Sequence, residues 1–152
     1  MKKEPKNIRE TSAKVLGTPL ASEYEIPLFN SRPQAGFPSP GDDLIEKVLD
    51  INDLLVQNPA STFFVRVEGD SMIGAGIFSG DVLVVDRSII AKDGSIVVAA
   101  VFGELVVKRL FARNDEYALV SENEAYKPIT ICDNDECFIW GVVVGSVRQF
   151  DH

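Results

Sequence analysis

Residues 95–110 have the sequence SIVVAAVFGELVVKRL, and this stretch indicates the class of fold. It contains most of two runs rich in β-branched residues, 95–102 and 104–112, which meet at Phe102-Gly103. Valine and isoleucine favour strands, and a tight glycine-containing turn between two such runs favours antiparallel pairing. We therefore predict a β-hairpin with two long strands at this place.

The same pattern continues on both sides of the hairpin, from Ser61 to the end of the chain. Each further run is rich in Val, Ile, Phe or Tyr and is bounded by Gly, Asp, Asn or Pro. These runs cover 62–68, 81–86, 116–121, 128–132 and 137–149. Seven short strands in a chain of 152 residues predict one mainly β domain, with a strongly coiled antiparallel sheet or a partly closed barrel.

The segment before this domain has a different character. Residues 1–33 contain four prolines and no sustained hydrophobic period, which predicts a mostly extended N-terminal arm. Within the arm, residues 26–29 form an apolar patch that we expect to dock against some other surface. After a proline-containing stretch, residues 41–49 are interpreted as a short amphipathic helix that begins at Gly41-Asp42-Asp43, and 50–57 as a further helical turn.

Charge and hydropathy restrict the partners. The net charge is −8; six Lys/Arg against four Glu give residues 1–35 a charge of +2, so the remainder carries −10. An acidic body argues against direct binding to a phosphate backbone, so a role in nucleic-acid metabolism would run through protein partners. The sequence has neither a membrane-length apolar run nor a secretion signal, and we expect a cytoplasmic protein without membrane contact.

The two cysteines, Cys132 and Cys137, bracket an acidic segment that is typical of a turn. We interpret them as two free thiols, because no further Cys or His lies nearby to complete a metal site. A disulfide would fit a reducing compartment poorly. No cofactor and no metal are expected.

A serine and a lysine are the candidate catalytic residues. Ser71 follows the run 62–68, while Lys108 lies between Val106 and Leu110 on one face of its strand. Burial there would lower the lysine pKa from about 10.4 and make the amine a possible base. The only histidine is His152, at the chain end, so a Ser-His-Asp triad is excluded. Alternatively, Lys108 reaches water along its aliphatic stem and Ser71 only caps a turn.

Ser71 and Lys108 lie in two of four sequence blocks whose order along the chain resembles that of a known family. The blocks GDSM (69–72), GDVLVVD (80–86), GSIVVAAV (94–101) and VVKRL (106–110) together resemble the LexA/UmuD family of self-cleaving serine peptidases. Upstream, Ala35-Gly36 resembles the family's scissile bond. The segments 36–40, 61–65 and 125–131 are similar to its UmuD branch, and the resemblance covers roughly residues 34–148.

The resemblance implies a LexA-like peptidase fold and a set of roles. Ser71 would be the nucleophile and Lys108 the neutral base that accepts its proton. The backbone N–H groups of Asp70 and Ser71 would face the developing oxyanion, and the bond between Ala35 and Gly36 would be cut. Residues 1–35 would then be an arm removed by self-cleavage, and residues 36–152 a β-rich peptidase and dimerisation domain.

The resemblance also implies partners. RecA filaments on single-stranded DNA would stimulate cleavage during the SOS response, and the processed homodimer would join UmuC in the translesion DNA polymerase V. Replicative polymerase subunits, including the sliding clamp, are further candidate partners. Whether cleavage runs in cis or in trans is left open.

Three alternative functions compete with this interpretation. A LexA-like repressor would need a helix-turn-helix domain, for which the arm is too short and too rich in proline. A signal peptidase would need a membrane anchor. The third reading is an inert β-rich interaction module.

Overall fold

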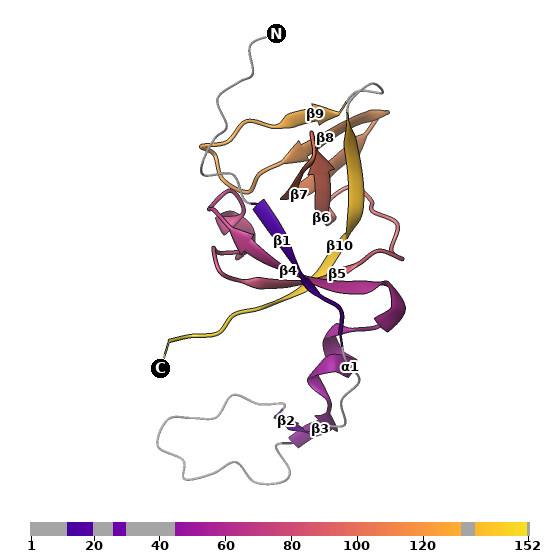
Figure 1. Ribbon diagram of the computed structural model, residues 1–152, viewed down its shortest axis with the longest axis vertical. Coiled ribbons are helices and arrows are strands. Elements are labelled where there is room, and N and C mark those ends of the chain that lie inside the picture. Colours follow the sequence, from indigo (N-terminus) through magenta and orange to yellow (C-terminus); the bar gives the residue numbers. More distant parts are fainter. Residues whose placement is uncertain (1–11, 20–25, 30–44, 132–135, 152) are drawn as a thin grey trace.

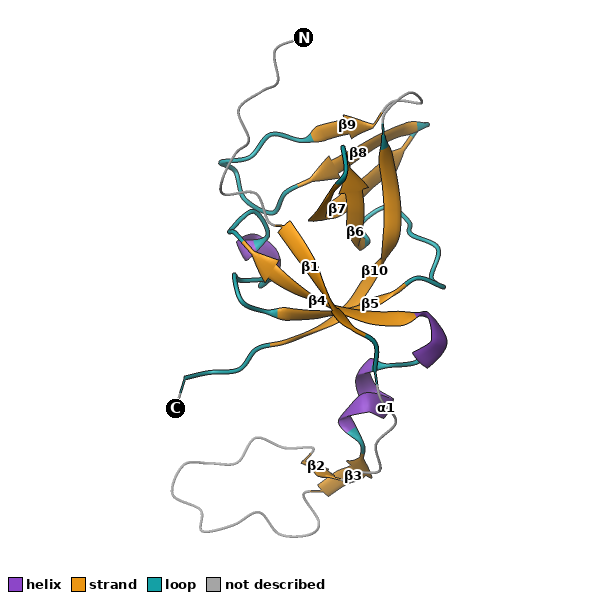
Figure 2. Cartoon of the chain, in the orientation of Figure 1, coloured by secondary structure: helices purple, strands orange, loops and turns teal. Residues whose placement is uncertain are grey.

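The computed structural model describes residues 12–19, 26–29, 45–131 and 136–151. Strands make up most of this part of the chain, and the helices are short (Figure 2). The strands are β1 (Ser12–Gly17), β2 (Ile26–Phe29), β3 (Ile45–Leu49), β4 (Thr62–Glu68), β5 (Val82–Asp86), β6 (Ile96–Val101), β7 (Glu104–Arg113), β8 (Glu116–Val120), β9 (Ile129–Ile131) and β10 (Cys137–Val147). The helical elements are α1 (Ile51–Leu55) and two 3-10 turns, η2 (Pro59–Ser61) and η3 (Ile73–Ala75). The seven predicted strands correspond to β4–β10, each to within two residues.

Eight strands form one antiparallel sheet in the order β1-β4-β5-β10-β6-β7-β8-β9. β1 also pairs with β7, through Ser12 and Val106. The six strands from β1 to β7 in this sheet order therefore form a ring. β8 and β9 continue the sheet beyond the ring, at the end of the molecule opposite α1 (Figure 1). The predicted mainly β fold with a partly closed barrel is thus confirmed.

The predicted hairpin is the pair β6–β7. Val101 lies opposite Glu104, and the two residues between them have positive φ, 49° at Phe102 and 82° at Gly103. Two successive positive φ values give a turn whose twist matches that of antiparallel strands, and glycine adopts such a value without strain. The turn therefore fixes the register of β7, and with it the position of Lys108 opposite Val97.

The two faces of β7 pack into two hydrophobic clusters. Val107 belongs to a cluster built mainly from β4, β5 and the segment after Ser71, whereas Val106 and Leu110 belong to a second cluster with residues of β6, β8 and β10. Side chains on a strand alternate between its faces, so Lys108 shares the face of Val106 and Leu110. All three side chains are buried, and Lys108 is only 1% exposed.

One expectation for the N-terminal third is wrong. The helix predicted over 41–49 is wrong where the structure describes it, because Ile45–Leu49 is strand β3, paired with β2. The rest of that segment, 41–44, lies outside the described residues. The apolar patch at 26–29 is the partner strand of this pair. The helical turn expected within 50–57 is confirmed as α1, and the side chain of Asp50 caps it by accepting the Asn52 N–H at 2.8 Å.

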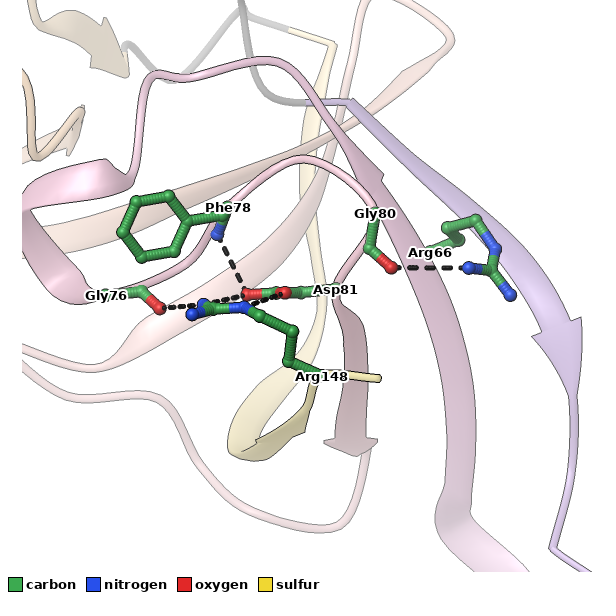
Figure 3. Close-up of polar contacts among 6 residues, drawn as sticks. All are labelled: Arg66, Gly76, Phe78, Gly80, Asp81 and Arg148. Carbon is green, nitrogen blue, oxygen red and sulfur yellow. Dashed lines mark hydrogen bonds and ion pairs between the residues drawn. The ribbon is translucent and has the colours of Figure 1, made fainter. Parts of the chain in front are cut away.

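The segment that follows Ser71 is anchored to the end of β10 by a buried carboxylate. Arg148 donates two hydrogen bonds of 2.7 Å to Asp81, and the Phe78 N–H donates a third at 2.9 Å (Figure 3). Arg148 also donates to the Gly76 carbonyl at 2.9 Å. Asp81 is 1% exposed, and the hydrogen bonds from Arg148 lower its pKa below the ordinary 3.8 although burial alone would raise it.

Replacing Arg148 by alanine should destabilise the fold at pH 7 more than an ordinary surface substitution does, because the buried Asp81 carboxylate loses its charged partner. The pKa of Asp81 is depressed in the folded state, so this contribution is complete above about pH 4 and disappears as the pH falls through the folded pKa. Urea unfolding of both proteins at several pH values measures the difference.

Arg66 provides the matched control. It donates one hydrogen bond of 3.2 Å to the neighbouring Gly80 carbonyl from an exposed position (Figure 3). Arg66→Ala should change the free energy of unfolding by less than about 0.5 kcal/mol. Equal losses in the two variants, or a loss in Arg148→Ala that does not become smaller as the pH falls below about 4, would contradict the assigned role of the buried pair.

Candidate functional site

Ser71 lies in a tight turn after β4. Gly69 has a φ of 98°, which turns the chain sharply after Glu68, and its N–H donates to the hydroxyl of Ser79 at 3.4 Å. Ser71 and Met72 are both fully buried, and Met72 belongs to the same hydrophobic cluster as Val67. The packed methionine therefore holds the serine inside the protein.

Lys108 reaches the same place from β7. Its Nζ lies 3.1 Å from Oγ of Ser71 and 2.9 Å from Oγ of Ser121, and 5.4 Å from the centre of the Tyr126 ring. The burial predicted for Lys108 is confirmed, and the reading in which its ammonium extends into water does not hold. The fold thus brings together the two residues that the sequence singled out, 37 positions apart.

A loop between β8 and β9, residues 121–126, holds the Ser71 turn in place. Two of its side chains donate hydrogen bonds to Asp70. Asn123 Nδ2 donates to the Asp70 carbonyl at 3.0 Å, and the Tyr126 hydroxyl donates to the Asp70 carboxylate. The loop backbone also takes part, because the Glu122 carbonyl accepts the N–H of Gly74 at 2.8 Å. The residue before the serine is therefore fixed from two directions.

Close backbone approach explains the glycine at position 74. A Cβ atom added there would lie 2.6 Å from the Glu122 carbonyl oxygen, which is shorter than real contacts allow. On its other side the loop is anchored to β7, because Glu122 forms an ion pair with Arg109, the neighbour of Lys108. Arg109 also donates to the Gly94 carbonyl at 2.7 Å. These contacts tie the 121–126 loop to β7 and to the segment that carries Ser71.

No sequence pattern had indicated a role for Ser121, Asn123 or Tyr126. Tyr126 lies in a segment used for the family resemblance, but nothing in that segment indicated contact with Asp70, 56 positions away. The only local signal was a cluster of polar residues directly after the run 116–121. Such a cluster is equally typical of an ordinary solvated loop.

Other predicted site residues are not tested by the geometry. Ala35 and Gly36 lie outside the described residues, as does His152. The assignment of the Asp70 and Ser71 N–H groups to an oxyanion stays a prediction. In the part of the chain that is described, no cluster of His, Cys, Asp and Glu could hold a metal ion. Cys137 begins β10, and Cys132 is not among the described residues.

The edges of two strands converge beside the site. Ser12 of β1 pairs with Glu68 near the end of β4, three residues before Ser71, and also with Val106 of β7, two residues before Lys108. An extended segment thus already runs between the two strands that lead to the serine and the lysine.

A search of the described helices for a membrane span found none with the necessary length and hydropathy.

Comparison with known proteins identifies the family of this chain. The family described as Peptidase S24-like matches residues 27–144. The chain is 51% identical to protein ImpA of Escherichia coli and 42% identical to protein MucA of the same species, each over 127 residues that cover 83% of this chain and 86% of the relative. It is 37% identical to the LexA repressor of Alcanivorax borkumensis over 128 residues, 84% of this chain and 61% of the repressor. The chain therefore belongs to the Peptidase S24-like family, with UmuD homologues among its relatives.

Proposed function

We propose that this chain is a self-cleaving serine peptidase that uses Ser71 and Lys108 to cut the bond between Ala35 and Gly36. The observation that carries the proposal is the 3.1 Å separation between Lys108 Nζ and Ser71 Oγ, in a place where both side chains are at most 1% exposed. A buried position favours an uncharged amine over an ammonium, and only the uncharged amine can accept a proton.

The proposed reaction begins with Ser71. Its Oγ attacks the carbonyl carbon of Ala35 while its proton passes to Nζ of Lys108, and the carbonyl electron pair moves onto oxygen. When the tetrahedral intermediate collapses, the bond to Gly36 breaks and the ammonium returns the proton to the leaving amine. Water then hydrolyses the ester on Ser71, which releases residues 1–35 and restores the hydroxyl.

Stabilisation of the oxyanion is assigned to the backbone N–H groups of Asp70 and Ser71. The contacts from Asn123 and Tyr126 to Asp70 support this assignment, because donors that are fixed before reaction need not reorganise as charge develops. The turn also leads directly from β4, whose position is set by its pairing with β5.

The route for the scissile segment is proposed to lie between β4 and β7. An extended peptide added at this place would run alongside both strands that lead to the catalytic pair. The position of β1 supports the route, because five residues of β1 are registered against β4. A cleavage segment in cis or from a second copy would have to take the place of β1 there.

We further propose a role in the SOS response, based on the kinship with UmuD homologues. RecA filaments on single-stranded DNA would stimulate the cut, which separates the arm (residues 1–35) from the β-rich domain (36–152). The product would act in the cytoplasm as a homodimer with UmuC in the translesion DNA polymerase V, with further contacts to replicative polymerase subunits including the sliding clamp.

Self-cleavage should accelerate with alkalinity. Because the base must be uncharged, the rate of appearance of fragment 36–152 should rise from pH 7 to about pH 10 and level off once Lys108 has lost its proton. Intact-mass measurements over time give the rate. Ser71→Ala and Lys108→Ala should each slow the reaction by at least about 100-fold at every pH.

The control variant is Lys92→Ala, which removes an exposed lysine. It should cleave like the unaltered chain. If the mass of the unaltered chain stays constant at pH 10, with or without RecA filaments, the inert interaction module is the better description. If cleavage survives Ser71→Ala, a different nucleophile is at work.

The position of the bond can be tested separately. Gly36→Val should block processing, because a β-branched side chain next to the bond keeps the carbonyl from approaching the serine to about 3 Å. Its midpoint of urea unfolding should match that of the unaltered chain. Cleavage at the original rate and mass would mean that the bond lies elsewhere.

A further inference from the structure

We propose that Ser121 is the positioning residue of Lys108: its hydroxyl holds the Nζ atom so that the amine presents its lone pair to Ser71. The inference rests on the proposed function of the Ser71–Lys108 pair and adds a third residue to it. The observation behind it is the 2.9 Å separation between Ser121 Oγ and Lys108 Nζ, slightly shorter than the 3.1 Å to Ser71.

The proton inventory of an amine makes such a partner useful. A neutral lysine carries two N–H groups and one lone pair. If the lone pair accepts the Ser71 O–H, then an N–H must point elsewhere, and Ser121 Oγ lies within hydrogen-bond distance to accept it. After proton transfer the ammonium has three N–H groups, and the same hydroxyl can still accept one of them. One acceptor thus serves both states of the base.

Orientation is a real problem for this side chain. Lysine has a flexible four-carbon stem, and on its own strand face it is flanked only by the aliphatic Val106 and Leu110. Aliphatic packing limits where the stem lies but cannot select the direction of the lone pair. A hydroxyl at a fixed position can do so, since a hydrogen bond depends strongly on angle.

The position of Ser121 is itself well supported. It directly follows β8, which is registered against β7 up to the pair Val120–Arg109. The next residue, Glu122, is held by the ion pair with Arg109 and by the N–H of Gly74. The hydroxyl therefore belongs to a part of the chain that is fixed to β7 and to the segment after Ser71.

Other ionisable groups near the amine also influence the titration of Lys108. Tyr126 contributes its ring face at 5.4 Å from Nζ, and its hydroxyl donates to the Asp70 carboxylate. Glu122 is engaged with Arg109. A comparison of variants at position 121 keeps all of these groups in place, so that a change in the titration reports on the hydroxyl alone.

The test has two readouts. Against the unaltered chain, Ser121→Ala should lower the plateau rate of self-cleavage at high pH by roughly 10- to 100-fold. In the uncleavable Ser71→Ala background, the titration of Lys108 followed by carbon NMR of its Cε should move to lower pH when Ser121→Ala is added, because the ammonium loses an acceptor. Ser121→Thr, which keeps the hydroxyl, should restore both values.

Ser95→Ala is the matched control, since that hydroxyl also accepts one hydrogen bond, from the Lys92 N–H at 3.1 Å. It should leave rate and titration unchanged. An unchanged plateau in Ser121→Ala, or an unchanged Lys108 titration in the uncleavable background, overturns the role of Ser121. If the unaltered chain never cleaves but the titration moves, the proposed peptidase function fails while the contact stands.

Discussion

The rest of the site depends on one buried contact, that between the amine of Lys108 and the hydroxyl of Ser71. Burial disfavours the cationic form of an amine, because the charge loses its hydration. The fold nevertheless buries Lys108 to 1% exposure, on a strand between Val106 and Leu110 of one hydrophobic cluster. Packing alone gives no reason to place a lysine there, which is why the contact supports a chemical role.

The surroundings of this contact are built to keep its geometry. The turn that carries Ser71 is held on one side by the 121–126 loop through Asp70. On the other side, the chain that leaves the turn is anchored through Asp81 to Arg148 near the C-terminus. Three distant parts of the sequence, residues 70–81, the 121–126 loop and Arg148, are therefore bound to one another around the site. Such multiple attachment is what a preorganised site requires, because small displacements of a nucleophile reduce its reactivity steeply.

The accuracy of prediction from the sequence differs from element to element. The strands β4–β10 were predictable because β-branched runs alternate with glycine- and aspartate-rich turns, and the burial of Lys108 followed from simple alternation along β7. The segment 45–49 was predicted wrongly because Ile45, Val48 and Leu49 also fit a helical period; in five residues the two periods cannot be separated, and pairing with β2 decides. Ser121 and Tyr126 were missed because their importance comes only from contacts with residues far away in the sequence.

The strand that closes the ring, β1, lies upstream of the proposed cleavage site. It is registered against β4 over five residues but joined to β7 by a single residue pair, and Val15 and Leu16 are 43% and 45% exposed. A cut between residues 35 and 36 would sever its covalent link to the body and leave it attached by pairing alone. Its loss would turn a closed ring into an open sheet with the backbone donors and acceptors of β4 exposed along one margin. Cleavage would in this way allow the edge of β4 that pairs with β1 to become available to another strand.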